Sequence, residues 1–241
     1  MVALKRFLLS LETRKLSGDF TMTISKDCAD FLRQFHSTTF GQKLKATHAR
    51  EIVAAYFGYK SHAAQLAETL FPISELGAAS ILVPDVSCIA WRLQRLNGLP
   101  SNIPEAYQLA RVLSDFLVRA GTFAGKVWLY DSLGSYVVEE YLRDNHGVIE
   151  DEVSGAMAST NAIFDEYPEY DEPRVSDNGD NVQILVAGTM YGSSDQDRPY
   201  SGHEIGVSAT VTLDRVAGRT SFMEPELDVG GALKDGYYAE A

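Results

Sequence analysis

Cysteine is scarce in this chain, as are the features that would tie it to a metal or a membrane. Only Cys28 and Cys88 occur among 241 residues, and their separation matches neither a zinc site nor a redox dithiol. No apolar run approaches the ~20 residues that cross a bilayer. Glu12 and Arg14 interrupt the apolar run 7–9, which is too short for a secretory signal. We therefore expect a cytoplasmic protein without a cofactor or a membrane segment.

Motifs that would identify a reaction are also missing. No serine stands on a glycine-flanked elbow, and no Gly-rich run continues into the Lys and Ser or Thr of a phosphate loop. Such absences do not exclude an enzyme, because catalytic groups can come together from distant parts of a chain. The composition, with 45% hydrophobic and 22% charged residues, is typical of a globular protein.

Charge is unevenly distributed along the chain. Residues 1–65 hold ten Lys and Arg against five Asp and Glu, a net +5, whereas residues 66–241 hold eleven against twenty-eight, a net −17. Acidic blocks such as 150–152 and 165–172 are usually solvated faces. A surface of this charge can also repel nucleic acid, attract a basic protein, or imitate the phosphate backbone toward a protein that normally binds it.

Apolar residues in the first part recur every three to four positions, the period of a helix buried on one face. Ser61 and Ser132 are placed to cap helices, and Gly58, Gly98 and Gly121 to end them. The segments predicted to be helical are 25–35, 47–57, 62–70, 87–96, 104–120, 132–145 and 150–164, and residues 123–130 are predicted to form a strand.

After residue 180 the apolar period becomes two, which indicates strands over 182–191 and 205–214. An Asn-Gly turn at 178–179 should lead into the first of them, and Pro225 should either place a last strand over 220–229 at an edge of the sheet or interrupt it. The pattern predicts an α+β fold, in which a helical N-terminal region precedes a small antiparallel β-sheet. The predicted organisation is an N-terminal arm 1–20, a helical region 21–147, an acidic connecting segment 148–180 and an antiparallel β region 181–241.

Two candidate sites follow from the residue types. The helices flanking Gly58 resemble a helix-turn-helix, and the basic residues beside them that could contact nucleic acid are Lys43, Lys45, Arg50 and Lys60. Their second helix offers only His62 and Gln65 to reach base edges, so a core-forming helical pair is the favoured interpretation.

The second candidate is a loop between the two long strands. Its donors for a divalent cation are Asp195, Asp197, His203 and Glu204. The same residue types also serve as ordinary turn residues.

The hypothesis that these observations favour is a non-enzymatic intracellular adaptor with an acidic surface that binds a protein partner. One alternative is an accessory protein that binds nucleic acid through its basic helices. The other is an enzyme with a site in the loop 195–204. The sequence does not determine the oligomeric state.

Overall fold

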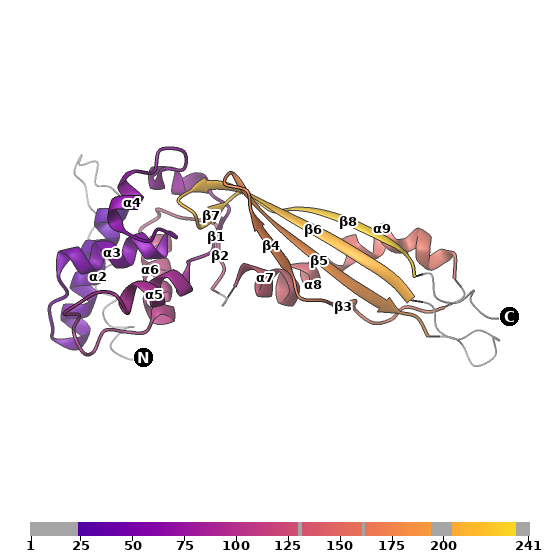
Figure 1. Cartoon of the computed structure of the whole chain (residues 1–241), viewed down its shortest axis with the longest axis horizontal. Helices are drawn as coiled ribbons and strands as arrows, with labels where there is room; N and C mark the ends of the chain where they lie inside the picture. Colours follow the sequence, from indigo (N-terminus) through magenta and orange to yellow (C-terminus); the bar gives the residue numbers. More distant parts are fainter. Residues whose placement is uncertain (1–23, 130–131, 161, 194–203, 235–241) are drawn as a thin grey trace. The chain divides into compact units, whose positions relative to one another are not determined.

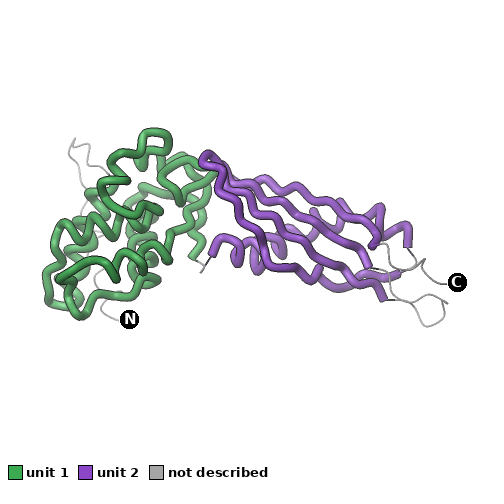
Figure 2. Tube along the Cα trace, in the orientation of Figure 1, with its two compact units in different colours: residues 1–129, 215–223 green, residues 130–214, 224–241 purple. Residues whose placement is uncertain are grey.

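The computed structural model describes residues 24–129, 132–160, 162–193 and 204–234 (Figure 1). It confirms the α+β fold, with helices through most of the chain up to residue 158 and the long strands after residue 180. The chain divides into two compact units (Figure 2). Unit 1 comprises residues 1–129 and 215–223, and unit 2 comprises residues 130–214 and 224–241.

Unit 1 is mainly helical. Its helices are α2 (Ile24–Phe40), α3 (Ala46–Tyr56), α4 (His62–Leu66), the 3-10 helix η1 (Ile73–Ala78), α5 (Val86–Leu93) and α6 (Ala106–Arg119). Ser61 Oγ accepts the backbone N–H of Ala64 at 3.1 Å and so caps α4, as predicted. Gly58 and Gly121 have φ of 82° and 69° and lie just after α3 and α6, which confirms these two predicted helix ends. Gly98 also has a positive φ, of 73°, but α5 already ends at Leu93, so the helix predicted over 87–96 is too long.

The prediction for α4 is too long, since the helix ends at Leu66 rather than near residue 70. The carboxylate of Glu68 accepts the backbone N–H of Leu70 at 2.9 Å and that of Phe71 at 3.3 Å. These bonds offer the backbone an alternative to the next helical turn, and the chain leaves the helix there.

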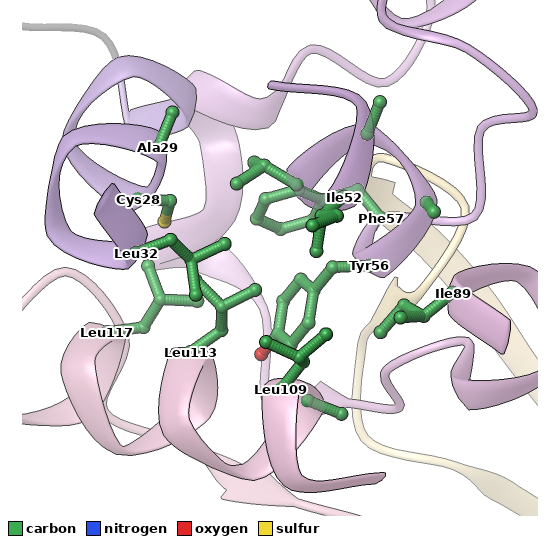
Figure 3. Packing of buried hydrophobic residues seen from close by; sticks show 14 of the residues in the cluster. Cys28, Ala29, Leu32, Ile52, Tyr56, Phe57, Ile89, Leu109, Leu113 and Leu117 are labelled. Carbon is green, nitrogen blue, oxygen red and sulfur yellow. The ribbon is translucent and has the colours of Figure 1, made fainter. Parts of the chain in front are cut away.

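The core of unit 1 lies between α2, α3, α5 and α6 (Figure 3). Tyr56 is fully buried at its centre, and its hydroxyl lies 2.8 Å from Ser114 Oγ. Ser114 in turn donates to the carbonyl of Ala110 at 2.9 Å, so Tyr56 donates to Ser114. Burial raises the pKa of Tyr56, with the bond to Ser114 acting in the opposite direction. The Tyr56 hydroxyl thus has a hydrogen-bond partner within this apolar core.

Short strands complete unit 1. Strand β1 (Ile81–Leu82) pairs in parallel with β2 (Lys126–Val127) and antiparallel with β7 (Ser221–Phe222). The strand predicted over 123–130 is therefore only two residues long, and a strand also occurs inside the region predicted to be helical. An apolar pair such as Ile81–Leu82 is too short to display a period, so only its neighbours in space define it as a strand.

Unit 2 is built on an antiparallel sheet. Its strands are β3 (Glu169–Tyr170), β4 (Arg174–Asp177), β5 (Asn181–Tyr191), β6 (Glu204–Ala217, of which 215–217 belong to unit 1) and β8 (Glu226–Leu233). β5 pairs with β6 over an unbroken register from Asn181 opposite Asp214 to Tyr191 opposite Glu204. Both long strands and the interruption between β7 and β8 around Pro225 confirm the predictions.

The acidic connecting segment predicted over 148–180 contains the strands β3 and β4. β4 forms a hairpin with β5, and its turn contains Gly179 with φ of 88°, as the Asn-Gly pair predicts. Pro173 and the neighbouring acids conceal this short edge strand in the sequence, because both are typical of loops.

Helices cover one face of this sheet. They are α7 (Leu133–Tyr136), the π-helix η2 (Val137–Tyr141), α8 (Leu142–Asp144) and α9 (His146–Ala158). The backbone N–H of Ser135 donates to Ser132 Oγ at 3.0 Å, which confirms the predicted cap. The buried residues that alternate along the two long strands are Val182, Ile184, Val186, Ile205, Val207, Ala209, Val211 and Leu213.

Two adjacent glycines in β8 lie on opposite faces of the sheet. A Cβ at Gly231 would overlap Val153 Cγ1 of α9, whereas a Cβ at Gly230 would meet only Ser208 Oγ, at 3.3 Å. Val153 is fully buried and has no room to move. The absence of a side chain at Gly231 therefore lets α9 pack closely on β8.

We expect Gly231→Ala to destabilise unit 2 by about 1–3 kcal/mol through overpacking. The matched variant Gly230→Ala should change stability by less than about 0.5 kcal/mol, because its methyl group meets only the hydroxyl of Ser208, an exposed side chain that can rotate away. Hydrogen exchange of β6 and β8 measures both effects within unit 2. Equal effects of the two substitutions would contradict this packing.

Candidate interaction surfaces

The two units carry opposite charge. Unit 1 contains seventeen Lys and Arg and ten Asp and Glu, a net +7, whereas unit 2 contains four and twenty-three, a net −19. This separation is larger than the +5 and −17 obtained by cutting the sequence after residue 65. The difference arises because the unit boundary assigns the basic residues up to Lys126, and also Arg215 and Arg219, to unit 1.

The two acidic stretches of unit 2 meet at His146. His146 Nε2 lies 3.0 Å from Glu150 Oε1 on α9, and the imidazole ring contacts the Tyr167 ring at a tilt of 47°, with ring centroids 4.3 Å apart. Through His146, Glu150 of the first stretch is linked to Tyr167, which directly follows Asp165 and Glu166 in the sequence. We call residues 150–152 with 165 and 166 the acidic surface. Most of its side chains are exposed, including Asp151 and Glu152.

The four predicted nucleic-acid contacts are all exposed. Lys43 and Lys45 precede α3, Arg50 lies in its second turn, and Lys60 follows it. These residues are not followed by a recognition helix long enough to enter a DNA groove, because α4 has only five residues. Gln65, one of its two candidate base contacts, is buried. The basic residues thus remain a charged surface without a recognition helix.

Three of the four predicted cation ligands, Asp195, Asp197 and His203, lie outside the described residues. The fourth, Glu204, is exposed at the start of β6, with its Oε2 3.8 Å from Lys234 Nζ. Within the described part of the chain, no group of three or more His, Cys, Asp or Glu is arranged to hold a metal ion.

A polar cluster in unit 1 has no signal in the sequence. Tyr59 donates its hydroxyl proton to Glu68 Oε2 at 3.1 Å, and the guanidinium of Arg219 lies 5.6 Å from the Tyr59 ring centroid. Burial and the nearby Glu68 carboxylate raise the pKa of Tyr59. For Glu68, burial raises the pKa, but hydrogen bonds from Leu70 and Phe71 outweigh burial and leave the pKa below its ordinary value. The cluster holds the loop after α4 rather than a ligand.

The two cysteines are poor nucleophiles in this fold. Burial raises the pKa of Cys28, and burial together with the Asp85 carboxylate raises that of Cys88 to about 11. Because the thiolate is the reactive form, both side chains act mainly as small apolar groups, as the sequence suggests.

Comparison of the chain with models of known protein families, with curated proteins and with solved structures finds no match in any of the three. Among the described residues, no helix combines the length and the apolar character needed to cross a membrane.

We expect Glu68 to make the stability of unit 1 depend on pH. Because its pKa is lowered on folding, its stabilising contribution is complete above the ordinary value of 4.5 and is lost as pH falls through the lowered value. Both tryptophans, Trp91 and Trp128, lie in unit 1, so their fluorescence reports its unfolding.

The measurement is the free energy of unfolding of wild type and Glu68→Gln between about pH 3 and 7, a range that spans the carboxylate titration. The advantage of wild type should be constant near neutral pH and should shrink in acid. Glu75→Gln, at an exposed position of η1, serves as the control. A wild-type advantage that does not vary with pH would contradict the assignment.

Proposed function

We propose that this protein is a non-enzymatic interaction or adaptor protein whose acidic unit 2 binds a basic protein partner. The observation that carries the proposal is the net −19 of unit 2 beside the net +7 of unit 1. Four basic side chains cannot neutralise twenty-three acids, so most of this charge faces solvent and any approaching molecule. Such a field accelerates encounter with a basic surface and disfavours a polyanion.

The acidic surface is the part of unit 2 that best suits such a partner. It joins a helix and a neighbouring segment through the contacts of His146 with Glu150 and Tyr167. Tyr167 is 58% exposed in the middle of these acids. An exposed aromatic ring among carboxylates provides apolar area together with charge, a combination found where interfaces bind tightly.

Binding should depend on the position of the acids and not only on their number. We expect Asp151→Asn with Glu152→Gln to weaken binding of a fluorescent Lys/Ser peptide to the full chain about fivefold or more at low salt. The matched double variant Asp180→Asn with Asp214→Asn removes the same charge near the β4–β5 turn and should weaken binding less than about twofold.

Fluorescence anisotropy measures both affinities, and a Glu/Ser peptide of the same length tests the sign of the charge. Equal losses in the two variants would show that net charge alone attracts the peptide and would contradict the acidic surface. Failure of the wild type to bind the basic peptide at low salt would contradict the proposal as a whole.

The second candidate function is nucleic-acid binding by unit 1. Its net +7 and the exposure of the four basic residues around α3 favour it. If this function holds, replacing Lys43, Lys45, Arg50 and Lys60 by Ala abolishes retardation of duplex DNA or RNA at low salt. Wild-type affinity should fall steeply as salt rises, because each phosphate contact releases counterions.

The matched control removes four exposed basic residues elsewhere in unit 1, namely Lys26, Arg111, Arg119 and Lys126. It should leave retardation largely intact. Absence of any retardation of wild type in low salt would contradict this second function, as would equal losses in the two quadruple variants.

A further inference from the structure

Strand β8 forms one edge of the sheet in unit 2. It pairs with β6 from Ile205 opposite Leu233 to Thr212 opposite Glu226, and within the described chain no strand pairs with its other side. None of its eight residues is buried. A long exposed edge presents unpaired backbone groups to any other strand.

The opposite edge of the sheet is protected in the usual ways. It consists of β3 and β4, which are two and four residues long. Asp171, Glu172 and Pro173 separate them, and charges and proline discourage the pairing of further strands. β8 lacks proline and has no charged residue between Asp228 and its end. The two edges thus differ in their capacity to accept a strand.

The register identifies which backbone groups of β8 are directed outward. The N–H of Lys234 donates to the carbonyl of Glu204 at 2.9 Å, so this pair is hydrogen-bonded. In an antiparallel ladder such pairs alternate, and the even-numbered residues of β8 therefore bond to β6. The odd-numbered residues direct their N–H and C=O groups away from it, and these are Leu227, Val229, Gly231 and Leu233.

We propose that β8 pairs antiparallel with β8 of a second copy of this chain, about a two-fold axis at Gly230. In this register Leu227 lies opposite Leu233 and Val229 opposite Gly231, each an apolar pair formed by outward-directed residues. On the other face Glu226 lies opposite Lys234, and symmetry repeats this pair. A two-fold interface is self-complementary, so one strand supplies both halves.

In this register every outward-directed backbone N–H and C=O group of β8 has a hydrogen-bond partner. The outward N–H and C=O groups of the four odd-numbered residues bond to their counterparts in the second copy. Other registers align less of the strand or place like charges together. An axis at Val229 leaves Lys234 without an opposite charge on β8, and an axis at Asp228 places that carboxylate against itself. An axis at Gly231 places Asp228 opposite Lys234 but pairs Glu226 with no described residue. Like charges directly opposite each other destabilise a strand pair. The axis at Gly230 is therefore the register that aligns residues 226–234 end to end with opposite charges at Glu226 and Lys234.

Two effects oppose the pairing. Each chain carries a formal net charge of −12, and this repulsion is screened beyond about 8 Å at physiological salt. Lys234 Nζ also lies 3.8 Å from Glu204 Oε2 and donates a hydrogen bond to Thr189 Oγ1 at 2.5 Å, both within its own chain. The ion pair is about half exposed on both sides and contributes little stability, so the pairing requires Glu226 of the second copy to displace mainly the bond to Thr189.

The test is sedimentation velocity of the full chain from about 1 µM to about 1 mM, a range that resolves specific dimers of ordinary affinity. Wild type should dimerise, and Val229→Pro should remain monomeric because it removes an outward N–H and no bond to β6. Val229→Thr retains that N–H and should dimerise. Circular dichroism confirms that each variant is folded.

A charge exchange tests the alignment. Glu226→Lys alone and Lys234→Glu alone should each weaken the dimer about tenfold or more, because each places like charges opposite at two positions. The double variant restores opposite charges and should recover most of the affinity. Glu204→Gln breaks the pair within the chain and should not weaken the dimer.

Three results would overturn the proposal: a wild type that stays monomeric throughout, a dimer that survives Val229→Pro, or a double variant no better than either single one. The proposed function is tested separately, because Asp151→Asn with Glu152→Gln should weaken peptide binding and leave dimerisation intact.

Discussion

The register between β5 and β6 is the constraint on which unit 2 depends. From Asn181 to Tyr191 each residue of β5 has a partner on β6 without a break. Because side chains alternate across a sheet, this alignment places the apolar residues of both strands on the face that the helices cover. A shift of one residue would move the whole apolar set to the open face. β4 is joined to this pair through β5, and β8 through β6.

A separate core in each unit is what allows the charge to be divided so unequally. Unit 1 packs α2, α3, α5 and α6 around Tyr56 and has a basic surface. In unit 2 the sheet and α9 supply the core, and the acids remain on strand faces, the helix surface and connecting segments. Acidic charge on this scale contributes little to stability, because exposed ion pairs are weak. Binding of a basic partner, as proposed above, would give this charge a use.

The parts of the fold that could be predicted are those whose signal is local. Alternation over 205–214 and the capping serines at 61 and 132 describe a few neighbouring residues, and the structure confirms each of them. Strands β1 and β3 have two residues each and carry no period, so they become visible only beside their partners. The early end of α4 depends on the Glu68 side chain, which no helix pattern reveals.

The candidate surfaces, too, could be predicted only as far as their signal is local in the sequence. Acidic stretches near 150 and 165 are evident in the sequence, but only the fold shows that His146 brings them together. Likewise, the sequence shows a strand after Pro225 without showing which of its sides faces β6. Among the cation ligands proposed for the loop 195–204, Glu204 is the one that lies within the described residues. Surfaces depend on contacts between distant residues, and a single sequence does not encode these in a local pattern.

The central claim is that unit 2 is where a basic partner binds. Hydrogen exchange of the full chain, with and without a bound Lys/Ser peptide, locates the contact directly. The account predicts slower exchange in residues 146–152 and 162–170, with α3 and its flanking lysines unchanged. Protection confined to residues 43–60, or spread evenly over both units, would contradict it.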